Sequence, residues 1–205
     1  MNRLSNSKNT TTDSGSAEAL TRWQQHWLDT TRTGSWEPQD YVCPFCELAA
    51  GDPSDRDNLC ELTDMVYQDE LVMAFIACDG FGPRPGHVMI VPTQHHETLY
   101  TLPADVQTAI MSLAQELAFA IKLAWSPEGV STRQHNEPAG NQHVWHYHLH
   151  IFPRYRDDNL YRQLRERLPV AFRAEKAREL SAALTTVQES KQQFLAAEQK
   201  AERTA

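Results

Sequence analysis

Short apolar runs in the middle of the chain predict β-strands. Met65–Gln68 and Leu71–Ile76 are separated by the polar pair Asp69 and Glu70, a pattern that predicts two strands joined by a tight turn. His87–Val91 is a compact run rich in β-branched residues and predicts a third strand.

Longer amphipathic stretches predict three helices, over Ala17–Leu28, Asp105–Ala124 and Val170–Ala201. The central helix carries its apolar residues on one stripe, formed by Val106, Ile110, Leu113, Leu117 and Ile121. Residues 1–15 are polar and rich in Ser, Thr and Asn, so we expect disorder there. Residues 30–40 carry Gly, Pro and small polar residues and are expected to form a linker.

Residues 146–152 read HYHLHIF, in which histidines alternate with apolar residues. In a strand over Val144–Phe152 the three histidines would share one face, and the residues between them would face a core. Alternate residues lie about 6.6 Å apart along a strand, which places His146 and His150 about 13 Å apart. The two outer imidazoles therefore cannot easily hold one metal ion, and the row indicates a polar groove.

This segment resembles the H-φ-H-φ-H-φ-φ signature of the histidine-triad superfamily. The resemblance extends upstream through residues 136–142, NEPAGNQ, and takes in residues 85–92, PGHVMIVP, which are similar to the PGH strand of the family. It covers about residues 40–155, and neither terminal extension belongs to it.

The resemblance implies an α+β fold with an antiparallel sheet and a packed helix, commonly paired into a homodimer. Three regions are expected on this basis. Residues 1–39 would form an N-terminal extension with a short helix, residues 40–156 the histidine-triad domain, and residues 157–205 a long helical C-terminal extension.

The resemblance also assigns a chemical role to two histidines. In the family, the middle histidine of the triad attacks the α-phosphorus of a nucleotide and forms a covalent nucleotidyl-histidine. His148 occupies this position, and a neutral imidazole is a competent nucleophile near pH 7. By the same resemblance, His150 would hydrogen-bond the reacting phosphate or the leaving group.

Four further positions are similar to substrate-binding residues of the family. Asp79 would accept hydrogen bonds from the ribose hydroxyls, and Asn136, Gln142 and His143 would lie near the phosphate. The segment from Asn136 to His146 is one residue shorter than in the phosphoramidase branch. At His143 the family often has Ser or Thr, and an imidazole there could donate to phosphate or alter the preferred leaving group.

A second group of residues resembles the zinc site found in some members of the superfamily. That site uses a C-x-x-C pair, a later histidine and the first histidine of the triad, here Cys43, Cys46, His95 and His146. Such a set of four sulfur and nitrogen ligands is typical of structural zinc. A redox role for the C-x-x-C pair stays open from composition alone. His96 competes with His95, but the family's Pro-x-x-His spacing favours His95, and no organic cofactor is implied.

Composition limits the classes of partner. The chain has 205 residues, 40% of them hydrophobic, and a formal net charge of −8, which argues against an extended nucleic-acid surface. No apolar run reaches the length of a membrane span, and no signal peptide is recognised. We therefore expect a cytoplasmic protein with a small-molecule nucleotide partner, and neither nucleic acid nor membrane as a partner.

The expected function is that of a nucleotide hydrolase. It would cleave a phosphoramidate or a dinucleoside polyphosphate at the α-phosphate through a nucleotidyl-His148 and release a nucleoside monophosphate. A nucleotidyl transferase or phosphorylase of the same superfamily stays open, although the uridylyltransferase relatives usually carry Gln where this chain has His150. A non-catalytic nucleotide-binding or scaffold protein is a third possibility. A catalytic zinc on His148 and His150 is weaker, because the sequence offers no third ligand.

Overall fold

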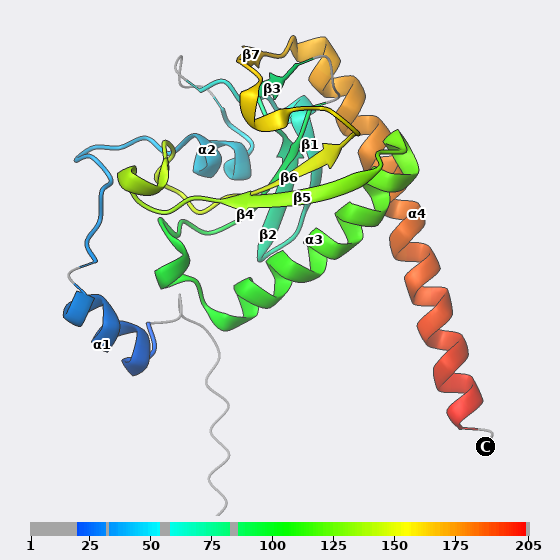
Figure 1. Cartoon of the computed structure of the whole chain (residues 1–205). Coiled ribbons are helices and arrows are strands. Elements are labelled where there is room, and N and C mark those ends of the chain that lie inside the picture. Colours follow the sequence, from blue (N-terminus) through cyan, green and yellow to red (C-terminus); the bar gives the residue numbers. More distant parts are fainter. Residues whose placement is uncertain (1–19, 32, 54–57, 83–85, 204–205) are drawn as a thin grey trace, which may run out of the picture. The chain divides into compact units, whose positions relative to one another are not determined.

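The computed structural model describes residues 20–31, 33–53, 58–82 and 86–203 (Figure 1). The chain divides into two units, Met1–Thr33 and Gly34–Ala205, and each is described by itself. The segment 1–15, for which we expected disorder, lies outside the described residues. No helix among the described residues combines the length and the apolar character that crossing a membrane requires.

The first unit contains helix α1 (Arg22–Thr31), which starts five residues later than the predicted helix Ala17–Leu28. Thr21 and Gln24 set this start, because the Thr21 hydroxyl accepts from the Gln24 N–H while the Gln24 side chain accepts from the Thr21 N–H. None of the side chains of α1 is buried.

The second unit is built on a five-stranded antiparallel sheet with the strand order β1-β2-β4-β6-β5. Its strands are β1 (Met65–Gln68), β2 (Val72–Ile76), β4 (Val88–Pro92), β5 (Gly129–Gln134) and β6 (Leu149–Arg154). The predicted turn between the first two strands is confirmed. The Asp69 carboxylate accepts from the N–H groups of Leu71 and Val72, each at 2.8 Å, and so fixes the turn.

Two helices, α3 (Ala104–Trp125) and α4 (Val170–Glu202), pack against one face of this sheet (Figure 1). The apolar stripe predicted for the central helix is buried there, together with Leu180 and Leu184 of α4. The predicted fold class, an α+β domain with an antiparallel sheet and a long C-terminal helix, is confirmed. Beyond residue 188 the side chains of α4 are exposed, and Figure 1 shows this end of the helix extending away from the sheet.

A short helix, α2 (Pro44–Ala50), packs on the opposite face of the sheet. Proline at its first position suits a helix start, and Gly51 ends it in the left-handed conformation with φ 76°. Phe45 and Leu48 are buried against Met73, Phe75 and Met89 of β2 and β4. The C-x-x-C pair therefore lies on the sheet face opposite α3 and α4.

The predicted strand Val144–Phe152 requires a correction, because the ladder begins at Leu149. The residues before it make other contacts: the Trp145 N–H donates to the Tyr41 hydroxyl, and the Tyr147 N–H donates to the carbonyl of His96. The predicted alternation still holds. Tyr147, Leu149 and Ile151 are buried in the core with α3, while His150 pairs with Met89 on the face that carries α2.

A second, two-stranded sheet joins β3 (Asp79–Phe81) to β7 (Arg165–Arg167) of the C-terminal extension. This sheet was not predicted from the sequence, because all three side chains of β7 are exposed and carry no apolar alternation. Gly80 permits the approach, since a Cβ atom at this position would lie 2.8 Å from Cδ2 of Leu168. Four short 3₁₀ turns complete the fold, at Leu62–Asp64, Leu99–Thr101, Pro138–Gly140 and Leu160–Arg162.

Candidate active site and metal centre

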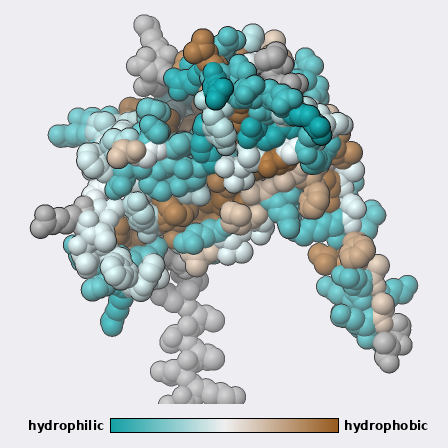
Figure 2. Space-filling view, in the orientation of Figure 1, coloured by the Kyte–Doolittle hydropathy of each residue, from teal (hydrophilic) through white to brown (hydrophobic). Residues whose placement is uncertain are grey.

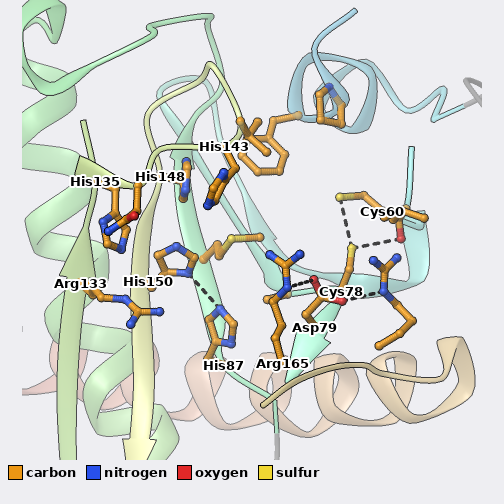
Figure 3. A pocket seen from close by; sticks show the side chains of 18 of the residues that line it. Cys60, Cys78, Asp79, His87, Arg133, His135, His143, His148, His150 and Arg165 are labelled. Atoms are coloured by element: carbon orange, nitrogen blue, oxygen red, sulfur yellow. Dashed lines mark hydrogen bonds and ion pairs between the residues drawn. The ribbon is translucent and has the colours of Figure 1, made fainter. Parts of the chain in front are cut away.

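A cavity of about 500 Å³ lies on the α2 side of the sheet (Figure 3). Four residues expected to take part in the chemistry line it, namely His148, His150, His143 and Asp79. A cavity of this size can hold a small ligand such as a nucleotide. Asp79 and the segment 143–150, which are far apart in the sequence, thus meet at this cavity.

The His148 ring is held in one tautomer by its backbone. Its Nδ1–H donates to the carbonyl oxygen of His146 at 2.8 Å. A carbonyl can only accept, so the proton of the neutral ring is on Nδ1 and Nε2 carries the lone pair. Burial lowers the pKa of His148 to about 4, which keeps the ring neutral at pH 7. The edge of Phe45 packs against the ring at a centroid distance of 5.7 Å.

His150 is paired with His87, which the sequence analysis placed only in a strand. His150 Nδ1 and His87 Nε2 lie 2.9 Å apart. His87 is buried and stacks on Phe152 at a centroid distance of 4.3 Å, and burial lowers its pKa to about 3. Both imidazoles are therefore neutral near pH 7.

The surroundings of His87 favour one arrangement of protons in this pair. Its Nδ1 atom is buried and has no hydrogen-bond partner among the described residues. A buried N–H without an acceptor is costly, so the proton of His87 is better placed on Nε2, from which it can donate to His150 Nδ1. His150 then carries its own proton on Nε2 and can donate it to a ligand.

Asn136 and Gln142 are not among the described residues that line the cavity. The side-chain oxygen Oδ1 of Asn136 accepts from the Leu99 N–H at 2.8 Å. Gln142 is buried, accepts from the Glu137 N–H and donates to the carbonyl of Glu97. These contacts order the loop before the triad, and a direct contact of either amide with substrate stays a prediction.

His135, one residue before Asn136, lines the cavity in its place. Its ring centroid is 6.2 Å from that of His150, and its Nδ1 lies in hydrogen-bond contact with the carbonyl of Gly140. The signal for this position was present in the sequence. Because the segment before His146 is one residue shorter than in the phosphoramidase branch, the side chain that faces the cavity is His135.

Three arginines add positive charge to the cavity wall, and the sequence analysis singled out none of them: Arg133, Arg165 and Arg167. Arg133 lies over the ring of Phe152 at 5.0 Å, and its charge contributes to lowering the pKa of both His87 and His150 after burial itself. The other two arginines come from β7 and contact Asp79 (Figure 3).

The four expected metal ligands form one cluster. One ligand atom from each of Cys43, Cys46, His95 and His146 lies within 4.8 Å of every other. The Nδ1 atom of His146 is 3.3 Å from Sγ of Cys43, and the Nδ1 atom of His95 is 3.3 Å from Sγ of Cys46. Two thiols and two imidazoles are a donor set that fits structural zinc.

The hydrogen-bond partners of the two Nε2 atoms, which point away from the thiols, also support a metal-binding role. His146 Nε2 lies 3.0 Å from the carbonyl of Pro92, to which it can only donate, and His95 Nε2 lies 2.8 Å from the Glu37 carboxylate. Protons on both Nε2 atoms leave both Nδ1 lone pairs facing the thiols, the arrangement that metal-binding histidines adopt. The hydrogen bond from Cys46 lowers the pKa of Cys43, and a thiolate is the metal-binding form.

Comparisons with known proteins agree with this arrangement. Residues 61–157 match the family model described as the HIT domain. The Bacillus subtilis protein named Protein hit is 34% identical over 114 residues, which are 55% of this chain and 71% of that protein. The crystal structure of a zinc-bound histidine triad family protein from Mycobacterium smegmatis is similar with a TM-score of 0.60 and 26% identity, covering 73% of this chain and 97% of that one. An adenylylsulfatase from Arabidopsis thaliana is 27% identical over 58% of this chain and 55% of that protein.

Proposed function

Because the chain belongs to the HIT family, whose name refers to the histidine triad, we propose that it is a nucleotide hydrolase that uses His148 as its nucleophile. The substrate is a nucleotide conjugate, a phosphoramidate or a dinucleoside polyphosphate, and the product is a nucleoside monophosphate. The observation that carries the proposal is the hydrogen bond from His148 Nδ1–H to the His146 carbonyl at 2.8 Å. It leaves the Nε2 lone pair of a neutral imidazole free to attack.

The proposed reaction has two steps. In the first, the Nε2 lone pair of His148 forms a bond to the α-phosphorus, and the bond from phosphorus to the leaving group breaks with its electron pair on that group. In the second, water attacks the same phosphorus and loses a proton to the solvent. The phosphorus–nitrogen bond breaks, and its electron pair returns to His148. Nucleoside monophosphate is released and the neutral imidazole is restored.

The other cavity residues act on the charge that develops at phosphorus. His150 Nε2–H donates to a phosphoryl oxygen, and the hydrogen bond from His87 holds the His150 ring for this purpose. His143 also lines the cavity and is available to donate to the phosphate or the leaving group. Arg133 supplies a fixed positive charge beside them. Preorganised donors and charges of this kind stabilise a transition state more than a ground state.

The proposal assigns zinc a structural role at Cys43, Cys46, His95 and His146. These residues would hold zinc between α2, the segment after β4 and the first histidine of the triad. The consequence falls on two groups near the reaction: the His146 carbonyl that holds His148, and the Phe45 ring that packs against it. Neither His148 nor His150 belongs to this ligand cluster, and the proposed nucleophile therefore stays uncoordinated.

The expected homodimer is also part of the proposal. Met111, Phe119 and Leu123 of α3 are exposed by 62%, 61% and 57%, and they offer apolar surface for a second copy. Light scattering on the purified full chain would give the mass of two chains if this is right, and of one chain if it is wrong.

A substrate panel tests the hydrolase proposal. The full chain and His148→Ala would be incubated with adenosine phosphoramidates, dinucleoside polyphosphates and nucleotide sugars, with and without added phosphate. Release of nucleoside monophosphate by the wild type alone supports the proposal. Formation of a nucleoside diphosphate only when phosphate is added would identify a phosphorylase instead. Equal release by both proteins, or by neither, would contradict the role of His148.

A further inference from the structure

Asp79 is held by two arginines from a part of the chain that the family resemblance does not cover. Its Oδ1 atom lies 2.6 Å from Nε of Arg167, and its Oδ2 atom lies 3.3 Å from Nε of Arg165. All three residues line the cavity that contains His148. Figure 3 shows Asp79 and Arg165 on the side of the cavity away from His135.

The segment that carries these arginines is fixed to the domain at several points. β7 pairs with β3 in the register Asp79 to Arg167 and Phe81 to Arg165. The next residue, Leu168, donates its N–H to the carbonyl of Cys78 at 2.9 Å, and its side chain occupies the space above Gly80. The two arginines therefore lie on a part of the cavity wall that backbone hydrogen bonds hold in place.

The same segment is also anchored from α4. Arg173 donates from Nε to Asp64 at 2.9 Å, and both side chains are almost completely buried. A second nitrogen of Arg173 contacts the carbonyl of Leu59 at 3.1 Å. Leu59 itself lines the cavity, so the anchor and the cavity wall share a residue.

The two arginines carry more positive charge than the carboxylate of Asp79 neutralises. Two guanidinium groups face one carboxylate, which leaves one positive charge. Both arginines contact Asp79 through Nε, and among the described residues neither forms an ion pair with any other carboxylate. The arginine side chains are 64% and 46% exposed, and exposed ion pairs contribute little to stability. The donors of two guanidinium groups match the geometry of a phosphate.

We infer that Arg165 and Arg167 form a second anion-binding subsite, and that the preferred nucleotide carries a phosphate on the 2′ or 3′ oxygen of its ribose. The inference rests on the proposed function, in which Asp79 marks the ribose side of the cavity. A phosphate on one ribose oxygen contacts the terminal nitrogens of the arginines, while the other hydroxyl donates to Asp79.

Binding of product-like nucleotides to the full chain tests this inference without requiring turnover. The probes are adenosine 5′-monophosphate, adenosine 2′,5′-bisphosphate, adenosine 3′,5′-bisphosphate and adenosine diphosphate, titrated calorimetrically at one ionic strength. We expect at least one bisphosphate to bind about tenfold more tightly than the monophosphate, the gain that charge-assisted hydrogen bonds give. We expect adenosine diphosphate, which has its extra phosphate on the 5′ chain, to lack this gain.

Two variants identify the residues responsible. In Arg165→Gln/Arg167→Gln the preference for the bisphosphate should fall below about threefold, because the donors to the ribose phosphate are lost. Arg156→Gln is the matched control. It removes the same kind of charge from the end of the domain, next to the C-terminal extension, but Arg156 pairs with Glu128 and is not among the residues that line the cavity. This variant should keep the preference of the wild type.

The possible outcomes separate this inference from the proposed function. Equal affinity for monophosphate and both bisphosphates would overturn the inference, and so would an equal gain for adenosine diphosphate or a preference unchanged in the double variant. The substrate panel measures turnover, and its result does not depend on the binding titrations. Intact turnover with no bisphosphate preference contradicts the subsite alone, whereas a clear preference without turnover contradicts the hydrolase alone.

Discussion

The carbonyl oxygen of His146 accepts a hydrogen bond from His148 at 2.8 Å, while the imidazole of His146 belongs to the cluster of metal ligands. One residue thus contributes to two sites, with its side chain in the candidate metal centre and its backbone on the proposed nucleophile. Phe45, which lies between the two cysteines in sequence, contacts both imidazoles at centroid distances of 5.7 Å. Changes at the metal centre should therefore affect the orientation of His148.

The first prediction follows from this link. Cys46→Ser should remove most of the bound zinc, lower the melting temperature and reduce kcat, because the His146 backbone and Phe45 lose their support. Zinc content would be measured by elemental mass spectrometry, and stability by calorimetry. Cys60→Ser is the control for zinc content, since Cys60 lies outside the ligand cluster. Wild-type protein without zinc after purification in zinc-containing medium would contradict the assignment.

The second prediction concerns His87 as a positioning residue. His87→Phe removes the hydrogen bond to His150, and we expect kcat to fall on the order of tenfold to a hundredfold with little change in KM. His87→Gln keeps an N–H that can reach His150 and should retain more of the activity. Steady-state kinetics on the preferred substrate of the panel would measure both. Equal activity of the wild type and His87→Phe would show that the pair does not act in the reaction.

The third prediction is a loss of stability in acid. Burial lowers the pKa of His87 in the folded protein to about 3, against about 6.5 for an unperturbed histidine. Between these values the unfolded chain binds a proton that the folded chain does not bind. The free energy of unfolding should therefore decrease as the pH falls from 6.5 towards 3, by up to about 1.4 kcal/mol per pH unit for this residue.

Urea unfolding at several pH values between 7.5 and 4 would measure this effect. Burial also lowers the pKa of His148 and of His150, so both add to the loss in the same direction. The His87→Phe variant should show a shallower dependence than the wild type. A free energy of unfolding that stays constant from pH 6.5 to 4 would be incompatible with a neutral, buried His87.

The fourth prediction concerns the anchor of the C-terminal extension. Arg173→Leu leaves the Asp64 carboxylate buried without its partner, and we expect a destabilisation of about 3–5 kcal/mol in urea unfolding. Lys191→Ala breaks the more exposed ion pair with Glu116 and should cost less than about 1 kcal/mol. Losses of similar size in the two variants would mean that the buried pair does not hold α4 in place.

The features that follow from hydrophobic periodicity and from the histidine triad could be predicted from the sequence. The long stripe of the central helix and the alternation around His148 each determine which side chains face the core between the sheet and α3, because that face of each element is apolar. The four candidate metal ligands were proposed from the resemblance to zinc-containing members of the superfamily, and the structure brings them together.

Features that depend on pairing between distant segments were not predicted. β7 is three residues long, Arg165–Arg167, and all of its side chains are exposed, so no apolar alternation marks it as a strand. Its position beside Asp79 follows from contacts of Leu168 with Gly80, which no local pattern reveals. His135 was missed for a different reason: the neighbouring Asn136 matched the residue type of the family, while the structure places the other side chain in the cavity.

A search for the covalent intermediate would test the role of His148 as the nucleophile. Wild type and His148→Ala would be mixed with excess substrate, quenched within one turnover at alkaline pH, and examined by intact-protein and peptide mass spectrometry. The proposed mechanism predicts that the wild type gains the mass of one nucleotidyl group on the peptide containing His148, and that the variant gains none. Turnover by the wild type without any such adduct, together with equal turnover by His148→Ala, would contradict it.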